Sequence, residues 1–373
     1  MNLLYIADNG FSVHDGKYYC TAPNRINIEQ YKKYFSQVHV IARKSRYQEG
    51  TFLIEDESKV VLIPKNHFLS LYRAMKDLSN SYDIVLMRNG INGCFAGIFA
   101  RKLKKTTIAY CGSDPFDFQR TRKGFFRRYI LAPIWGRFER NKMADADYSQ
   151  YCTSYLYKKY PTRHPYLICS NVDVEIDEND YFDRIKKIDG QSMEKKIGMI
   201  GQADERKGVR TIIRALARLG KTYRFEMIGG GNPELFEDEI EDLAVSEQIS
   251  FLGYCTDRNK MKMWLKGIDI YIQPSLAEGL PRSTIEAMAM ACPCVATDIA
   301  GLPDLLENDY LISPGDDAAL AEKIKWLSDN SEAAKKAAKK NFEKAKEFRR
   351  DVRDRKLDGF YGGIVNAVSA GGR

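Results

Sequence analysis

Residues 268–290 read IDIYIQPSLAEGLPRSTIEAMAM, a strand pattern, a short loop and a helical pattern in direct succession. Ile268–Gln273 is predicted to be a buried strand, and Ser283–Met290 is predicted to be the helix that follows it. Glu278 lies in the loop and Glu286 lies in the first turn of the helix. The free N–H groups and the dipole at a helix N-terminus attract anions. The stretch therefore predicts an α/β fold whose strand-to-helix loop binds an anion between two carboxylates.

Strand and helix patterns alternate along the rest of the chain, which is typical of doubly wound parallel sheets. The expected strands are Leu3–Ala7, Val38–Ala42, Val60–Pro64, Ile84–Met87, Thr107–Cys111, Tyr148–Cys152, Tyr166–Ile168, Lys196–Ile200, Arg224–Ile228, Ile249–Leu252, Ile268–Gln273 and Pro293–Thr297. The expected helices are Ile26–Phe35, Leu69–Leu78, Ala96–Lys102, Thr211–Leu219, Leu235–Ala244, Asn259–Lys266, Ser283–Met290, Asp317–Ser328 and Ser331–Arg350. An acidic stretch, 173–180, separates the two series and is expected to be a linker.

The composition indicates a soluble globular protein. A chain of 373 residues with 44% apolar residues can form two or three domains, each with its own core. No apolar run approaches the roughly 18 residues of a membrane-spanning helix, and Met1–Ala7 is too short for a secretory signal. The eight cysteines and four histidines show no zinc-ligand spacing and no catalytic-triad pattern. We expect reduced thiols, a cytoplasmic location and no metal.

The run Ser283-Thr-Ile-Glu286 has a structural interpretation beside the functional one. It fits a capping box, in which Ser283 caps the helix and Glu286 reaches back to the first backbone N–H group. Glu286 alone therefore does not identify a binding site.

The pair Glu278-x7-Glu286 resembles the donor-site signature of the retaining glycosyltransferase family 4. The resemblance implies the GT-B architecture, in which two Rossmann-like domains with doubly wound parallel sheets face a central cleft. The N-terminal domain, residues 1–170 with a crossover helix at about 356–373, would bind the acceptor, and residues 171–355 would bind the donor. In this family the first glutamate holds donor-sugar hydroxyls and the second holds the ribose, so Glu278 and Glu286 inherit those roles.

A second part of the resemblance lies at Gly201-Gln202 and Lys207-Gly208. The family has a Gly-Arg pair followed by Lys-Gly, so Lys207 is expected to bind the donor phosphates, whereas Gln202 stands where the arginine would be. Either Arg206 compensates or the diphosphate is held less tightly; the alternative for this segment is an ordinary surface turn. Further donor-binding residues are expected at Gly10, Gln202, Gly230, Tyr254, Gly279, Leu280, Pro281, Arg282 and Ser283.

The run Tyr110-Cys-Gly-Ser-Asp114 resembles a His-Gly-x-Asp motif of the same family. Cys111 replaces the histidine, which usually contacts the donor sugar. The resemblance therefore implies that Asp114 and the neighbouring backbone amides contact the donor sugar, or that the donor and the acceptor are arranged differently in this protein. Glu278, Lys207 and Asp114 are the expected catalytic residues.

The segment 116–142 holds eight basic and two acidic residues, a net charge of +6 out of +8 for the whole chain. Seven aromatic residues are interleaved with them. Basic and aromatic side chains in one segment suit an anionic membrane surface. The alternative is a solvated helix whose apolar face packs on its own domain.

Together these features predict a retaining, metal-independent transferase. It would move a sugar from a nucleoside diphosphate, expected to be UDP, to the hydroxyl of a lipid-linked saccharide in bacterial surface polysaccharide synthesis. The protein is then expected in the cytoplasm, peripherally on the inner face of the membrane, without nucleic acid. Three alternatives stay open: a metal-dependent GT-A transferase using Asp145-x-Asp147, a sugar-nucleotide epimerase or hydrolase of the same fold, and a non-catalytic membrane-binding adaptor.

Overall fold

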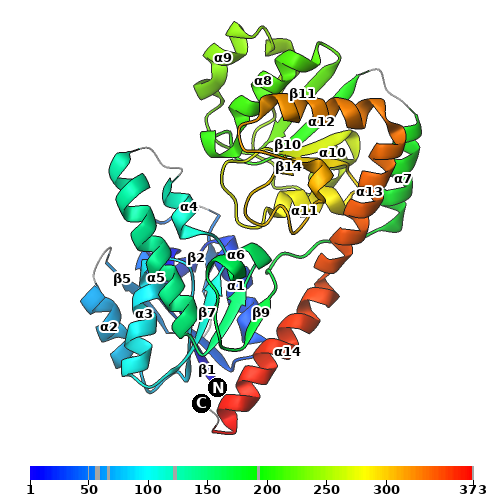
Figure 1. The fold of residues 1–373 in the computed structure, drawn as a ribbon. Helices are drawn as coiled ribbons and strands as arrows, with labels where there is room; N and C mark the ends of the chain where they lie inside the picture. Colours follow the sequence, from blue (N-terminus) through cyan, green and yellow to red (C-terminus); the bar gives the residue numbers. More distant parts are fainter. Residues whose placement is uncertain (49, 55–58, 65–67, 121–123, 191–193, 372–373) are drawn as a thin grey trace. The chain divides into compact units, whose positions relative to one another are not determined.

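The computed structural model describes residues 1–48, 50–54, 59–64, 68–120, 124–190 and 194–371. The chain forms two compact units (Figure 1). Unit 1 comprises Met1–Asn171 and Asp354–Arg373, and unit 2 comprises Val172–Arg353. The last helix, α14 (Arg350–Ser369), begins in unit 2, and its residues from Asp354 onward belong to unit 1.

Unit 1 is built on a sheet of nine strands. Seven of them pair in parallel, in the spatial order β5-β3-β1-β6-β7-β8-β9. Their bounds are β1 (Asn2–His14), β3 (Gln37–Lys44), β5 (Val60–Ile63), β6 (Ile84–Met87), β7 (Thr106–Cys111), β8 (Tyr148–Tyr151) and β9 (Tyr166–Ile168). The helices are α1 (Ala22–Lys32), α2 (Phe68–Asp77), α3 (Ile91–Lys102), α4 (Pro115–Arg120), the π-helix η1 (Arg127–Leu131), α5 (Ala132–Asp145) and α6 (Ser154–Lys159).

Unit 1 has the expected parallel sheet and, in addition, two strands that pair antiparallel and were not predicted. The first strand continues past Ala7 to His14, through a bulge that contains Gly10 with φ 80°. A two-residue turn at Asp15-Gly16, both with positive φ, then leads into β2 (Lys17–Cys20), which pairs antiparallel with β1 and with β4 (Phe52–Leu53). An Asp-Gly pair is a strong hairpin signal, because both central residues of this turn type need positive φ. The sequence contained that signal, and our prediction ignored it.

Unit 2 contains a wholly parallel sheet of six strands in the order β12-β11-β10-β13-β14-β15. The strands are β10 (Lys195–Ile200), β11 (Tyr223–Ile228), β12 (Ile249–Phe251), β13 (Ile270–Gln273), β14 (Cys294–Thr297) and β15 (Leu311–Ile312). The helices are α7 (Glu178–Asp189), α8 (Val209–Leu219), α9 (Glu237–Asp242), α10 (Arg258–Gly267), α11 (Arg282–Ala289), α12 (Asp317–Asp329) and α13 (Ser331–Ala345). Short 3-10 turns are η2 (Glu205–Lys207), η3 (Pro233–Phe236), η4 (Ser246–Gln248), η5 (Asn308–Tyr310) and η6 (Lys346–Phe348).

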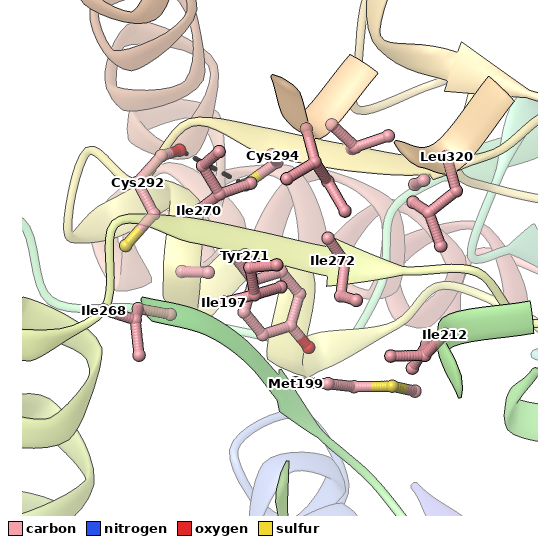
Figure 2. Close-up of a cluster of buried hydrophobic side chains, with 14 of the residues drawn as sticks. Ile197, Met199, Ile212, Ile268, Ile270, Tyr271, Ile272, Cys292, Cys294 and Leu320 are labelled. Atoms are coloured by element: carbon pink, nitrogen blue, oxygen red, sulfur yellow. Dashed lines mark hydrogen bonds between the residues drawn. The ribbon is translucent and has the colours of Figure 1, made fainter. Parts of the chain in front are cut away.

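The core of unit 2 lies between the central strands and the helices. Ile197, Met199, Ile270 and Ile272 are buried there together with Leu320 of α12 (Figure 2). Each side chain of this size contributes roughly 1.5–3 kcal/mol when it is fully buried. The helix expected over Leu235–Ala244 is instead divided into η3 and α9, and the expected linker at 173–180 already contains the start of α7.

The cysteines are free thiols among the described residues, as expected. Cys292 and Cys294 are buried in the core of unit 2, where the Cys294 thiol donates to the carbonyl of Cys292 at 3.2 Å (Figure 2). This close pair is therefore part of the packing.

A buried guanidinium joins α7 to the core of unit 2. Arg184 donates from Nε to the carbonyl of Met290 at 3.3 Å and from Nη2 to the carbonyl of Leu265 at 2.8 Å. Its Nη1 donates to the carbonyl of Ile268 at 2.5 Å. These bonds satisfy carbonyl groups at the C-terminal ends of two helices, α10 and α11, so the charge serves the fold.

We expect Arg184→Met to lower the free energy of unfolding by about 3 kcal/mol, because several buried carbonyl groups lose their donors. Urea denaturation followed by circular dichroism measures this change. The control is Arg218→Met, which removes an exposed ion pair with Asp317 and should cost less than about 1 kcal/mol. Equal effects of the two substitutions would contradict the structural role of Arg184.

Candidate functional site

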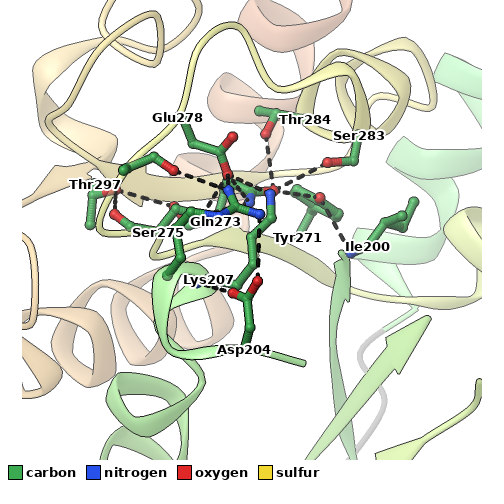
Figure 3. A network of polar contacts seen from close by, with 12 residues as sticks. Ile200, Asp204, Lys207, Tyr271, Gln273, Ser275, Glu278, Ser283, Thr284 and Thr297 are labelled. Carbon is green, nitrogen blue, oxygen red and sulfur yellow. Dashed lines mark hydrogen bonds and ion pairs between the residues drawn. The ribbon is translucent and has the colours of Figure 1, made fainter. Parts of the chain in front are cut away.

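The loops that follow β10 and β13 meet in unit 2, because these two strands are parallel neighbours. Lys207, in the first loop, and Glu278, in the second, form an ion pair with 2.5 Å between Nζ and Oε1 (Figure 3). Their side chains are only 11% and 8% exposed. The sequence placed these two residues in separate motifs, and the fold brings them into direct contact.

The carboxylate of Glu278 is bound by the protein through one oxygen. Its Oε1 accepts hydrogen bonds from Ser275 Oγ at 2.7 Å and Gln273 Nε2 at 3.1 Å, in addition to the ion pair with Lys207 (Figure 3). Oε2 has no hydrogen-bond or ion-pair partner in the part of the chain that the structure describes. The side chain is thus held in one orientation with its second oxygen available to accept hydrogen bonds.

Gln273 is fully buried and connects this carboxylate to helix α11. Its Oε1 accepts hydrogen bonds from Tyr271 Oη at 2.8 Å and from Ser283 Oγ at 3.2 Å, while its Nε2 donates to Ser275 Oγ at 2.9 Å and to Glu278 (Figure 3). Sequence reasoning missed Gln273 and Ser275 as site residues. The available signal was a polar residue in an otherwise apolar strand, since such a side chain must find partners in the interior.

The turn at Gly208 lets the first loop approach the second. Gly208 has φ 73°, and a Cβ atom there would lie 1.9 Å from the carbonyl oxygen of Pro274. The preceding turn, η2, is capped by Asp204, whose carboxylate accepts from the backbone N–H of Lys207 at 2.9 Å. Only glycine combines this backbone conformation with so close an approach. The alternative of an ordinary surface turn is therefore wrong, since Lys207 is buried.

Arg206 also faces the second loop. Its Nη1 donates to the carbonyl of Ala277 at 3.3 Å and lies 3.9 Å from Oε1 of Glu278. Gln202, at the position of the family arginine, is exposed. Two cations, Arg206 and Lys207, thus lie beside one carboxylate.

Helix α11 begins at Arg282, and its N-cap is Pro281, which makes no side-chain cap hydrogen bond. The capping-box alternative is therefore wrong: Ser283 lies inside the helix and donates to Gln273. Among the described residues, the side chain of Glu286 makes no hydrogen bond or ion pair. Burial raises the pKa of its carboxyl group, and Arg282 and Arg258 only partly oppose the effect.

The remaining expected donor residues of unit 2 occupy the surrounding loops. Gly279 accepts a backbone hydrogen bond from Gly301 at 3.0 Å, and Leu280 packs against the core. Tyr254 is 81% exposed. Gly230 has open space at its Cα, whereas its neighbours Gly229 and Gly231 pack closely on the backbone of Gly201 and Ala203. The outer glycines of the run therefore serve packing.

The expected residues of unit 1 have structural partners. Both oxygens of Asp114 are engaged: Oδ1 accepts from Tyr160 Oη at 2.6 Å and from the backbone N–H of Phe116 at 2.9 Å, and Oδ2 pairs with Lys159. Burial opposes ionisation of Asp114, but hydrogen bonds from Lys159 and Tyr160 outweigh it and lower its pKa. Cys111 is fully buried, and Gly10 lies in the bulge of β1.

The described residues contain no group of three or more His, Cys, Asp or Glu side chains arranged to hold a metal ion. Asp145 pairs with Arg101 at 2.9 Å, and Asp147 accepts from the backbone N–H and the hydroxyl of Thr107, both at 2.8 Å. These contacts explain the Asp-x-Asp pair as structural. Within the described chain, none of the helices combines the length and apolarity needed to cross a membrane.

Comparison with known proteins shows what the region around the site is similar to. Residues 182–344 match the family described as "Glycosyl transferases group 1". The matched residues lie within unit 2. They include Lys207, Glu278 and Glu286, so the ion pair described above lies inside the matched region.

Similar proteins extend the comparison to the rest of the chain. Protein CapJ of Staphylococcus aureus is 24% identical over 342 residues, which cover 87% of this chain and 85% of CapJ. The amylovoran biosynthesis glycosyltransferase AmsK of Erwinia amylovora is 30% identical over 146 residues, 36% of each chain. The crystal structure of HepE from Anabaena in complex with UDP superposes with a TM-score of 0.70 at 16% identity, covering 97% of this chain and 100% of HepE. The chain has the GT-B fold, as expected, and the metal-dependent GT-A alternative is wrong.

The raised pKa of Glu286 leads to a test by pH. Folding favours the protonated carboxyl group, so its contribution to stability is present below the pKa of the unfolded chain and is lost as pH rises through the folded pKa. Glu286→Gln keeps an uncharged side chain at every pH. We therefore expect this variant to be more stable than the wild type near neutral pH and equally stable in acid, as measured by urea denaturation across the pH range.

Glu239→Gln is the control of opposite sign. Burial opposes ionisation of Glu239, but hydrogen bonds from Arg210 and Arg214 outweigh it and lower its pKa. Its stabilising contribution is present above the unfolded pKa and is lost as pH falls through the folded pKa. The control should be less stable than the wild type at neutral pH and should converge with it in acid. A stability loss in Glu286→Gln at neutral pH would show that Glu286 supports the fold.

Proposed function

We propose that the protein is a retaining glycosyltransferase of the family 4 type that uses a nucleoside-diphosphate sugar, UDP-linked, without a metal ion. The observation that carries this proposal is the geometry at Glu278. One carboxylate oxygen is bound by Lys207, Ser275 and Gln273, and the other has no protein partner among the described residues. A carboxylate fixed in this way can accept hydrogen bonds from the hydroxyl groups of a sugar.

Charge at the site fits a departing diphosphate. Negative charge develops on the leaving phosphate as the bond to the sugar breaks, and preorganised cations and amides stabilise it there. Lys207 and Arg206 supply the cations, and the N-terminus of α11, which has no side-chain cap among the described residues, supplies backbone N–H groups. In the proposed step the acceptor oxygen bonds to the anomeric carbon on the face that the diphosphate leaves. The acceptor proton passes to the leaving phosphate oxygen, and Glu286 holds the ribose.

The relatives support the choice of substrates. HepE was crystallised with UDP, and AmsK is named for amylovoran biosynthesis. These similarities support a UDP-sugar as the donor. They also support an acceptor from bacterial surface polysaccharide synthesis, such as a lipid-linked saccharide. The proposed location is the cytoplasm, at the inner face of the membrane.

We expect Glu278→Ala to lower transfer at least about 100-fold, because the variant loses the group that orients the sugar and leaves Lys207 without its counter-charge. The assay supplies UDP-sugars and a membrane extract that contains saccharide acceptors. It measures the release of sugar from the donor and the transfer of sugar to the acceptor. Glu205→Ala, which removes an exposed carboxylate from the neighbouring turn, should retain activity.

Three further measurements test the rest of the proposal. NMR of the product should show retention at the anomeric carbon, and transfer should continue in a chelator. Turnover of the donor without any acceptor would favour the epimerase or hydrolase alternative. Full activity of Glu278→Ala would overturn the assigned site.

The segment 116–142 forms α4, η1 and α5 of unit 1, apart from residues 121–123, including Arg122 and Lys123, which lie outside the described residues. Phe125 and Phe126 are 74% and 61% exposed. Tyr129, Ile130, Ile134 and Phe138 are exposed as well, beside Arg127 and Arg128. Ala132 and Met143 of α5 pack on unit 1, as the alternative expects, whereas the side chains named above remain exposed.

We propose that this surface, defined by the exposed apolar side chains at 125–138 and the neighbouring arginines, binds an anionic membrane. Aromatic rings settle at the interface, and each cation near the headgroups contributes about 1 kcal/mol. Such binding would bring the enzyme to an acceptor held in the membrane.

We expect the double substitution Phe125→Ser and Phe126→Ser, and separately Arg127→Glu with Arg128→Glu, to abolish flotation with phosphatidylglycerol vesicles at low salt. The controls are Phe182→Ser, an exposed aromatic of α7, and Lys336→Glu with Lys339→Glu in the basic run of α13. Flotation that persists in both surface variants, or fails equally in the controls, would contradict the assignment. Raised salt should weaken wild-type binding through screening.

A further inference from the structure

Arg88 occupies the point in unit 1 where a doubly wound sheet binds ligands. It directly follows β6, which lies next to β1 at the centre of the sheet. From β1 the chain winds outward to β3 and β5, and from β6 it winds in the opposite direction to β7, β8 and β9. Ligands of such sheets bind beyond the carboxyl ends of the strands at this reversal.

The guanidinium of Arg88 lies against aromatic rings and has no counter-charge. Its Cζ is 4.5 Å from the ring centroid of Tyr110 and 6.0 Å from that of Tyr5. Its Nη1 is buried without a hydrogen-bond partner, and no ion pair of Arg88 occurs among the described residues. The hydroxyl of Tyr31, another neighbour of this cation, is also buried without a partner.

The groups nearest to Arg88 do not neutralise it. Burial raises the pKa of Tyr5 to about 12 and also raises the pKa values of Tyr31 and Tyr110, so all three phenols are uncharged at neutral pH. The carboxylate of Asp8, on the same strand as Tyr5, is already engaged. Its two oxygens accept from the backbone N–H groups of Ile91 and Asn92 at 2.8 and 3.0 Å, at the start of α3.

A buried structural arginine in the same chain provides the contrast. All three nitrogens of Arg184 donate to backbone carbonyl groups, which offsets the loss of hydration. Burying a cation costs several kcal/mol when no partner compensates it. Arg88 is partly exposed, and no hydrogen bond from its guanidinium to a backbone carbonyl group occurs among the described residues, so its charge is available to a ligand.

We propose that Arg88 binds an oxyanion, a phosphate or carboxylate group, that the acceptor substrate carries near its reacting end. Tyr5 and Tyr110 flank the guanidinium, whose N–H groups supply the donors. The identification of the ligand as the acceptor rests on the proposed glycosyltransferase function. The anion site itself does not.

The test measures thermal stabilisation of the full chain by inorganic phosphate at constant ionic strength, with and without saturating UDP. Under the proposed function UDP occupies the site in unit 2 and prevents phosphate from binding there. We expect the wild type to keep a saturable response to phosphate in UDP, and Arg88→Met to weaken its apparent affinity at least about tenfold. The control Arg73→Met, an exposed arginine of α2, should respond like the wild type.

The outcomes separate this inference from the proposed function. If UDP stabilises no variant, the donor assignment fails, but an Arg88-dependent response to phosphate still supports the anion site. If Arg88→Met responds to phosphate like the wild type, the anion site is overturned. We also expect Arg88→Met to be at least as stable as the wild type without anions, whereas a loss comparable to that of Arg184→Met would assign Arg88 to the fold.

If Arg88→Met does not fold, Arg88→Lys is used in its place. This variant keeps the positive charge but loses the planar set of guanidinium N–H donors. A phosphate affinity about fivefold weaker than that of the wild type would support the site, and an unchanged affinity would overturn it. Methyl phosphate and glucuronate, titrated in the same way, distinguish a phosphate-bearing acceptor from an acidic sugar. The anion that shows the larger Arg88-dependent stabilisation identifies the class.

Discussion

The close approach of two loops in unit 2 is the constraint on which the candidate site depends. Gly208 lets the loop after β10 lie against the carbonyl of Pro274 at the end of β13, and Lys207 then reaches Glu278. A buried ion pair is stable only when further hydrogen bonds satisfy its members. Ser275 and Gln273 supply them on one oxygen of Glu278, so desolvation is offset on that side alone. The same arrangement that stabilises the pair leaves the second oxygen for a ligand.

The alternation of apolar strands and helices was readable from the sequence because buried parallel strands are continuous apolar runs. Ile84–Met87 and Tyr166–Ile168 were predicted with the bounds observed. The errors arose where the backbone departs from that pattern. The hairpin at Asp15-Gly16 depends on two positive φ angles, and the bulge at Gly10 continues β1 through residues that read as a turn. Apolar periodicity carries no information about such local angles.

The site was predictable only in part. The resemblance placed Glu278 and Lys207 in their loops. The two residues are 71 positions apart in the sequence, and they meet only because β10 and β13 are neighbours in the sheet. The capping-box interpretation failed because the N-cap is Pro281 and not Ser283, so Ser283 lies inside the helix and donates to Gln273. A shift of one residue changes which backbone N–H group a side chain can reach. Boundaries of helices are the least certain feature of a sequence pattern.

In this chain, hydrogen bonds and ion pairs within the protein distinguish polar side chains that stabilise the fold from those that could bind a ligand. Arg184 and Asp114 are buried, and bonds to the protein occupy their polar atoms. Arg88 and Glu286 are similar in type, yet the described residues offer them no ion pair. Residue type is therefore insufficient to assign a role, because each pair contains one arginine and one carboxylate. A charged group held in the interior without compensation destabilises the fold, and binding a ligand of opposite charge or a hydroxyl donor removes that cost. Where such groups occur at the carboxyl ends of parallel strands, the fold itself favours the bound state.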